Sequence, residues 1–335
     1  MSSPTITSTI NKLPVGKTFA HLVRREFVEH RGSYFFTPVI LGLLMVGMVL
    51  FVLIPFVSFG EEIGNITIDN GFSIVGMGEI LEELEDKDLE TRETVMSAFM
   101  VIIAAPFLVA LLFIMVFAVL GSLFDDRIDK STLFWKSMPV SDTQEVISKL
   151  ISAIILAPAL AIGLAFVFQL AFLIIASLVV FYNGGSAWDI VWAPAPVFAQ
   201  PLGMFLSLVV VMLWQLPFWG WLTLSSSIAP KAPLLVAAVP LAIIVTLEQI
   251  FYQTHRFGSF MLDVIALNFS EIFGDTLNDR LDGYPRDLDV NVLLPSDAIY
   301  VFGQSVSMGS FYGMLALGTA FIAGAIYIRK SNVRL

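Results

Sequence analysis

The sequence predicts an all-α polytopic membrane protein with six transmembrane helices. Of the 335 residues, 57% are hydrophobic and only 14% are charged, whereas a soluble domain carries about 25% charged residues. Six stretches are also long and apolar enough to cross a bilayer, which takes ~20 mostly apolar residues. The sequence contains no cysteine, so disulfides, thiolate metal sites and cysteine nucleophiles are excluded.

The predicted spans divide the chain into a tail, a membrane domain and a second tail. The six spans cover about residues 38–59, 95–123, 150–181, 201–228, 232–252 and 306–328. They form one domain, 38–328, between an N-terminal segment (1–37) and a C-terminal tail (329–335). The larger connections are three loops on the outer side, 60–94, 182–200 and 254–305, and one on the inner side, 124–149.

The distribution of basic residues predicts that both termini lie in the cytoplasm. With this orientation, 13 of the 18 Lys and Arg residues fall in the N-terminal segment, the inner loops and the C-terminal tail. An excess of Lys and Arg marks the cytoplasmic side of a membrane protein. The opposite orientation would reverse this excess, so the sequence favours a multi-pass protein of the bacterial inner membrane.

Short amphipathic helices are expected outside the spans. Residues 18–34 alternate apolar and charged side chains at helical spacing, which is typical of a helix that lies on the membrane surface. The acidic stretch 79–93 carries leucines at helical spacing. In the long loop before the last span, apolar residues of the stretch 260–267 also recur at helical spacing. We expect an acidic outer helix and a short helical outer segment between the fifth and sixth spans.

Motifs for nucleotide or metal binding are incomplete. Gly16-Lys17-Thr18 resembles the end of a phosphate-binding loop, but the required earlier glycine is replaced by Asn11. Residues 287–298 match only the first half of a calcium loop, and the three histidines are scattered. The sequence therefore predicts a protein that is not an enzyme itself and that binds no cofactor or metal.

A few polar and aromatic side chains lie inside the predicted spans. Gln169 and Gln215 could hydrogen-bond between helices or line a substrate pathway. Glu248 lies ~26 Å along a helix from the inner loop, which favours the outer interface but leaves a pathway role open. Trp214 belongs to a tryptophan cluster that could form an apolar substrate wall or pack in the core beside the kink of Pro217.

The charged loop between the second and third spans has a recognisable pattern. Its characteristic steps are Asp126-Arg127, Ser131-Thr132-Leu133, Met138-Pro139-Val140-Ser141 and Lys149-Leu150. These steps resemble the cytoplasmic loop of permeases of the ABC exporter class that carries antibiotics and polysaccharides. The six spans with inner termini, the N-terminal interface helix and the large outer segment before the last span are similar as well.

The resemblance implies the transmembrane subunit of an ATP-driven exporter. ATP and Mg²⁺ would be bound by a separate ATPase present in two copies, and two permease subunits would pair as a homodimer or with a related chain. Membrane lipids are expected partners, and nucleic acid is not. The residues that would couple this chain to the ATPase are Arg24, Arg25, Asp126, Arg127, Thr132, Phe134, Trp135 and Pro139.

Charge pairs would orient the docking of the ATPase, and Phe134 and Trp135 would fill a pocket. The scarcity of polar groups in the spans favours an amphipathic or hydrophobic substrate. Two other functions stay open: a secondary transporter, and a non-transporting subunit for envelope signalling or enzyme maturation. The first would require ion-coupling charges in the membrane, for which Glu248 is the main candidate.

Overall fold

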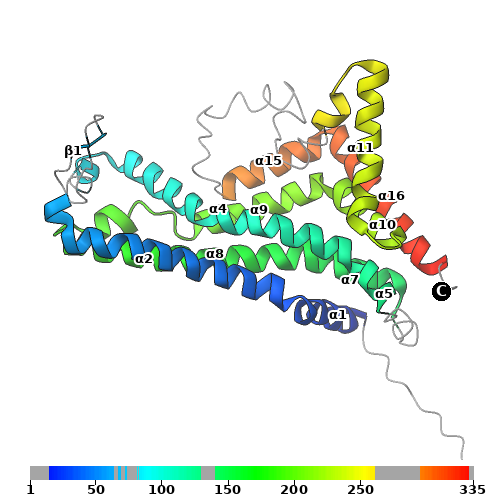
Figure 1. Ribbon diagram of the computed structural model, residues 1–335, viewed down its shortest axis with the longest axis horizontal. Coiled ribbons are helices and arrows are strands. Elements are labelled where there is room, and N and C mark those ends of the chain that lie inside the picture. Colours follow the sequence, from blue (N-terminus) through cyan, green and yellow to red (C-terminus); the bar gives the residue numbers. More distant parts are fainter. Residues whose placement is uncertain are drawn as a thin grey trace, which may run out of the picture.

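The computed structural model describes residues 15–63, 67–68, 72–73, 81, 83–129, 140–260 and 295–331, almost all of them helical (Figure 1). The α-helices are α1 Val15–Glu29, α2 Thr37–Ile63, α4 Leu89–Ser122, α5 Phe124–Ile128, α7 Asp142–Ile151, α8 Ala157–Tyr182, α9 Ala199–Trp214, α10 Leu216–Ile228, α11 Pro233–Tyr252, α15 Pro295–Ser307 and α16 Gly309–Ser331. Two short strands, β1 Thr67–Ile68 and β2 Phe72–Ser73, pair in antiparallel register.

The predicted fold class is confirmed at the level of a helical, polytopic membrane protein. Five helices are long and apolar enough to cross a membrane: Gly32–Leu53, Leu89–Ile128, Asp142–Tyr182, Pro233–Tyr252 and Gly309–Ser331. The pair α9 and α10 makes a sixth span if it is counted as one bent helix. In lipid every backbone polar group must be paired within the protein, which is why long apolar stretches fold as helices.

The fourth predicted span, 201–228, is broken near its middle. Helix α9 ends at Trp214, α10 begins at Leu216, and the two axes are bent by 63°. Pro217 lies in the first turn of α10. Proline is tolerated there because the backbone N–H that it lacks would have no partner within the helix. The expected proline kink is thus a complete break between two helices.

The described part of the chain contains three π-helical turns, η1 (Gly32–Phe36), η2 (Ser152–Leu156) and η3 (Trp188–Trp192). Each is followed two residues later by a proline, at positions 38, 158 and 194. In each case the residue before the proline donates its N–H to the carbonyl five residues earlier. The extra residue in the turn accommodates the proline, which clashes with the preceding turn of a regular α-helix.

The centre of the bundle is formed by α4 and α8, with α2 and α9 packed beside them (Figure 1). Phe107 of α4 stacks on Phe168 of α8, with ring centroids 5.6 Å apart. The side-chain amide of Gln169 donates to the carbonyl of Met100 at 2.8 Å, and that of Gln200 donates to the carbonyl of Ser97 at 3.1 Å. Both glutamines therefore tie α8 and α9 to α4 inside the apolar core.

Helices α10 and α16 cross with their backbones in close contact. A Cβ placed on Gly318 would lie 2.6 Å from the carbonyl carbon of Leu216, and one on Gly220 would lie 2.7 Å from the carbonyl oxygen of Gly318. Real side-chain atoms do not approach so closely, so only glycine fits at these two positions. Helix α15, most of which lies in the predicted outer loop 254–305, packs along α9.

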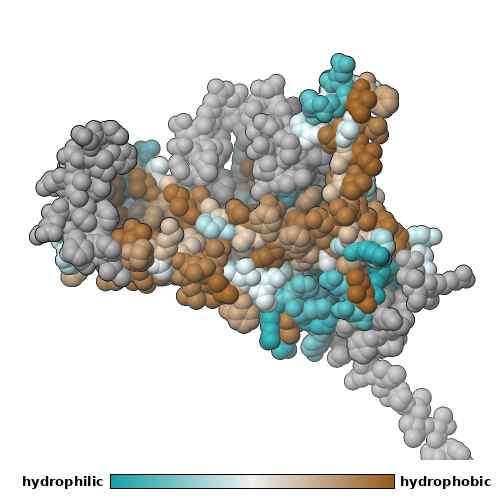
Figure 2. Space-filling model, viewed as in Figure 1, coloured by the Kyte–Doolittle hydropathy of each residue, from teal (hydrophilic) through white to brown (hydrophobic). Residues whose placement is uncertain are grey.

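Helix α11 stands away from the long helices and is in contact mainly with α10 (Figure 1). Trp221 of α10 donates its indole N–H to the carbonyl of Ala237 at 3.0 Å. Figure 2 shows hydrophobic residues over the long helices and hydrophilic residues gathered at one end, around α1. This polar end holds the candidate site.

The structure describes only parts of the two expected outer helices. Of the acidic stretch 79–93, residues 83–85 are helical and α4 already begins at Leu89, six residues before the predicted span. The apolar pattern 260–267 lies outside the described residues except for Phe260, which is helical. The helix α15 nevertheless occupies the region between the fifth and sixth spans.

Candidate functional site

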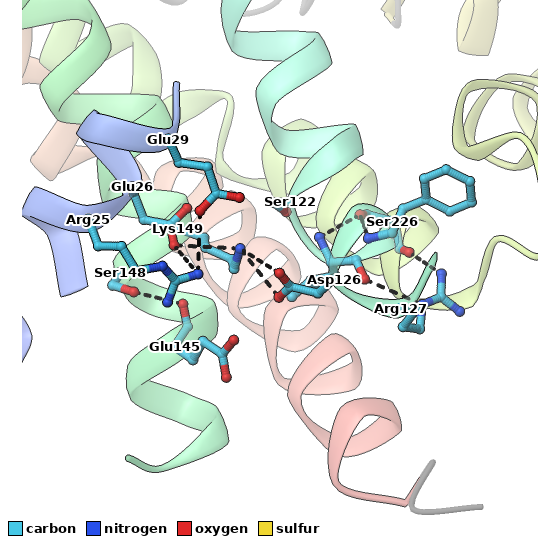
Figure 3. A network of polar contacts seen from close by, with 12 residues as sticks. Arg25, Glu26, Glu29, Ser122, Asp126, Arg127, Glu145, Ser148, Lys149 and Ser226 are labelled. Atoms are coloured by element: carbon cyan, nitrogen blue, oxygen red, sulfur yellow. Dashed lines mark hydrogen bonds and ion pairs between the residues drawn. The ribbon is translucent and has the colours of Figure 1, made fainter. Parts of the chain in front are cut away.

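Four helices from distant parts of the sequence meet at the hydrophilic end of the bundle. They are α1, α5, α7 and the last turn of α16. Charged side chains of α1, α5 and α7 lie close together there (Figure 3), and Arg329 of α16 forms ion pairs with Asp126 and Glu145. We call this region the charged end. The loop 130–139, which contains part of the sequence pattern described above, lies in the sequence between α5 and α7.

Helix α7 has a strongly specified start. The Ser141 hydroxyl accepts a hydrogen bond from the backbone N–H of Gln144 at 3.2 Å, and the Gln144 side chain accepts one from the Ser141 N–H at 3.3 Å. This reciprocal capping box satisfies two otherwise unpaired donors. It fixes where the helix begins, and it fixes the positions of Glu145 and Lys149, which are buried on one face.

Lys149 bridges two carboxylates that come from different helices. Its ammonium lies 3.5 Å from Glu26 of α1 and 3.3 Å from Asp126 of α5. All three side chains are at most 5% exposed. Figure 3 shows the three side chains in a row between the N-terminal helix and α5.

Arg329, in the last turn of α16, forms the other centre of the site. Its guanidinium lies 3.4 Å from Asp126, 2.5 Å from Glu145 and 3.7 Å from Asp142. The residues Glu26, Asp126, Glu145, Lys149 and Arg329 are here called the charge cluster, and all five are buried. Removing one partner of such a buried ion pair is strongly destabilising, because it leaves a charge without compensation.

The carboxylates in the charge cluster outnumber the cations by three to two. Arg25, which is one quarter exposed, supplies further positive charge at 3.2 Å from Glu26. Burial raises the pKa of the Glu26 carboxyl above its ordinary value of 4.5, and this effect exceeds the opposing ones of Lys149 and Arg25. Glu26, which lies outside the spanning segments, therefore holds its proton to a higher pH than an ordinary glutamate does.

The raised pKa of Glu26 predicts a pH-dependent stability. Because the folded state holds this proton more tightly, its stabilising contribution is full below pH 4.5 and is lost as the pH rises through the raised pKa. As the pH falls from neutral toward 4.5, the melting temperature of the wild type should rise relative to that of Glu26→Gln. Thermal unfolding in detergent at several pH values measures this, and parallel curves for the two proteins would contradict it.

A second group of contacts joins α5 to the end of α10. Arg127 donates to the carbonyls of Ser226 at 2.6 Å and Ala229 at 2.8 Å. The Ser226 hydroxyl donates to the carbonyl of Leu120 at 2.7 Å and accepts the N–H groups of Leu123 and Phe124. A cation that binds the last carbonyls of a helix also interacts favourably with the helix dipole.

The predicted coupling residues fall into three groups. Asp126 is buried and Arg127 is half-buried, and both are held by the contacts just described. Arg24 is exposed on α1, whereas Arg25 pairs with Glu26 and with Glu29 at 3.5 Å. Thr132, Phe134, Trp135 and Pro139 lie outside the described residues.

The predicted pathway residues do not belong to the charge cluster and make contacts of their own. Gln169 is bonded to α4, as described above. Trp214 donates its indole N–H to the Ser305 hydroxyl at 2.9 Å and packs edge-on against Phe311. Gln215 is the buried residue at the break between α9 and α10. These contacts match the packing role that the sequence left open, and a pathway role stays a prediction.

Glu248 anchors the turn that follows α11. Its carboxylate accepts hydrogen bonds from the Thr254 hydroxyl at 2.8 Å and from the Phe257 N–H at 2.9 Å. The carboxylate thereby binds the start of the next helical turn, residues 256–260. It gains its partners from neighbours in the sequence rather than from another span.

Sequence reasoning did not group Glu26, Glu145 and Arg329 into one site. The available signal was weak: Glu145 and Lys149 are four residues apart on a helix, so they share a face. Nothing in the spacing indicated that this face is buried. Within the part of the chain that the structure describes, no group of three or more His, Cys, Asp or Glu could hold a metal ion.

Comparison with known proteins gives no match. No family model, no curated protein and no solved structure matches the chain. The functional interpretation therefore depends on the residues and on their geometry.

Proposed function

We propose that the chain is the transmembrane permease subunit of an ATP-driven ABC exporter in the bacterial inner membrane. Its motor would be a separate ATPase subunit, present in two copies, that docks on the loop 130–139 and on the exposed side of α1. The observation that carries the proposal is the charge cluster. It connects α5 and α7, on either side of this loop, to the N-terminal helix and to the last span.

The proposed mechanism follows from these connections. Closure of the two ATPase subunits on ATP would displace the loop and α1, and helix α7 would pass the displacement directly into α8, because residues 142–182 form one continuous helical segment. Rigid-body rocking of packed helices is a common way in which membrane proteins change accessibility. The charge cluster would keep α1 and α16 in step with this motion.

The interior of the bundle supports an amphipathic or hydrophobic substrate. The buried glutamines Gln169 and Gln200 donate their amide N–H groups to carbonyls of α4, and Trp214 donates a hydrogen bond to Ser305. Such side chains hold helices together and offer little to a strongly hydrated solute. A second permease subunit would complete the walls of the pathway, with membrane lipid around both.

The proposal predicts that an ATPase co-purifies with the chain from native membranes. Phe134→Asp or Trp135→Asp should abolish recovery of the ATPase, since buried aromatic anchors dominate the affinity of protein interfaces. Trp188→Asp is the matched control, because Trp188 is an exposed aromatic residue in η3, beyond the far end of α8. Quantitative mass spectrometry of the purified complexes measures the result.

Two outcomes would contradict this function. Failure to recover any ATPase with a phosphate-binding loop from native membranes would remove its main requirement. Transport that continues after ATP depletion, and that stops in Glu248→Gln, would instead indicate a secondary transporter.

A further inference from the structure

The two ends of the loop 130–139 converge on the same charges. Asp126 precedes the loop, whereas Asp142, Glu145 and Lys149 follow it. Lys149 binds Asp126 directly at 3.3 Å, so one ion pair already closes the base of the loop. We call residues 124–129 and 140–149 the two stems of the loop.

Arg329 joins both stems to a third element. Its guanidinium lies 3.4 Å from Asp126 on the first stem and 2.5 Å from Glu145 on the second, with Asp142 at 3.7 Å. Its side chain is only 6% exposed, so these contacts are poorly screened by water and salt. The guanidinium has five N–H donors in a fixed planar fork, which allows one side chain to hold carboxylates on two sides.

The position of Arg329 in the sequence gives this contact its consequence. It lies in the last turn of α16, about 200 residues after the loop, and α16 is packed against α10 at Gly220 and Gly318. Arg127 ties the first stem to the end of α10 as well. A displacement of the stems relative to α16 would separate buried opposite charges, which is strongly unfavourable.

We propose that Arg329 is a positioning residue that clamps the two stems of the loop and couples them to the last span. The separation of the stems is set by the guanidinium fork of Arg329 together with the ion pair between Lys149 and Asp126. Movement of the loop and movement of α16 are therefore linked in both directions. The docking part of this inference rests on the proposed function, but the clamp is a property of this chain alone.

The absence of cysteine makes the clamp measurable without background labelling. Spin labels are introduced at Ile128 and Val140, one on each stem, and the distance between them is measured by pulsed electron resonance in lipid nanodiscs. The wild type and Lys330→Met should give one narrow distance. Arg329→Met should broaden the distribution of this distance, because the guanidinium no longer joins the two stems.

A reference pair separates this effect from general unfolding. Labels at Leu178 of α8 and Leu202 of α9, both exposed, report on the bundle far from the charge cluster. Their distance should remain narrow in Arg329→Met. An unchanged distance between the stems in Arg329→Met would overturn the clamp.

A milder variant covers the case in which Arg329→Met loosens the whole bundle. Arg329→Lys keeps the positive charge but replaces the fork by a single ammonium, which cannot hold both stems in the same geometry. It should broaden the distance between the stems while the reference pair stays narrow. If the distribution of the distance between the stems were as narrow in Arg329→Lys as in the wild type, the bridging role of the fork would be refuted.

The outcome for the clamp can be told apart from the outcome for the proposed function. The resonance measurement uses neither an ATPase nor nucleotide, so it stands if no ATPase co-purifies. If an ATPase does co-purify, Arg329→Met should reduce its recovery while Lys330→Met should not. A broadened distance between the stems together with undiminished recovery of the ATPase would confine the role of Arg329 to this chain and would refute its part in docking.

Discussion

Replacing Arg329 by methionine is expected to lower the free energy of unfolding by about 3–5 kcal/mol, the range found when one partner of a buried ion pair is removed. The substitution takes the nearest cation from Glu145 and one of two from Asp126. Three buried carboxylates would then share Lys149 as the one buried cation of the charge cluster. Denaturant unfolding of the purified protein in detergent micelles measures the loss.

The neighbouring residue offers a close control for this prediction. Lys330 carries the same charge and occupies the next position in α16, but it is exposed. Lys330→Met should change the stability by less than about 1 kcal/mol, because exposed charges contribute little. Equal losses for Arg329→Met and Lys330→Met would show that the charge cluster does not stabilise the folded chain.

Replacing Gly318 by alanine is expected to lower the free energy of unfolding by about 2 kcal/mol. Alanine favours a helix interior by about 1 kcal/mol over glycine, so the steric effect must exceed this gain. The added Cβ would lie 2.6 Å from the Leu216 carbonyl carbon and 2.8 Å from its oxygen. Because these are backbone atoms, α10 and α16 must separate, and overpacking of this kind costs about 1–3 kcal/mol or more.

The same substitution five residues earlier should have the opposite effect on stability. Gly313 lies in α16 as well, but no atom lies within 4 Å of the place where its Cβ would be. Gly313→Ala should therefore raise the stability by up to about 1 kcal/mol through helix propensity alone. Thermal unfolding of both variants tests the contrast, and a loss of stability in both would mean that α10 and α16 do not set the outcome.

The number and type of the main elements could be predicted because they follow from composition. The apolar stretches of the sequence correspond to α2, α4, the segment from α7 to α8, α9 with α10, α11 and α16. The amphipathic pattern of residues 18–34 likewise corresponds to α1 and η1. The extent of the break at Gln215 could not be predicted, since Pro240 lies inside the unbroken α11.

The candidate site could be predicted only in part. The loop pattern drew attention to Asp126 and Arg127, but it did not indicate that both side chains bind groups within the chain. Their role in docking stays a prediction. Asp126 is bound by Lys149 and by Arg329, which lie 23 and 203 positions away from it in the sequence. A local pattern carries no information about pairs that are so far apart.

The sequence by itself determined that this chain is a helical membrane protein, because a backbone in lipid must pair its own polar groups and long apolar stretches can do so only as helices. The tertiary structure alone decided which charges meet. A helix such as α7 has apolar and charged faces, and its periodicity does not say which of them turns toward the protein. Packing turned Glu145 and Lys149 inward, where Glu26, Asp126 and Arg329 compensate charges that could not be buried alone.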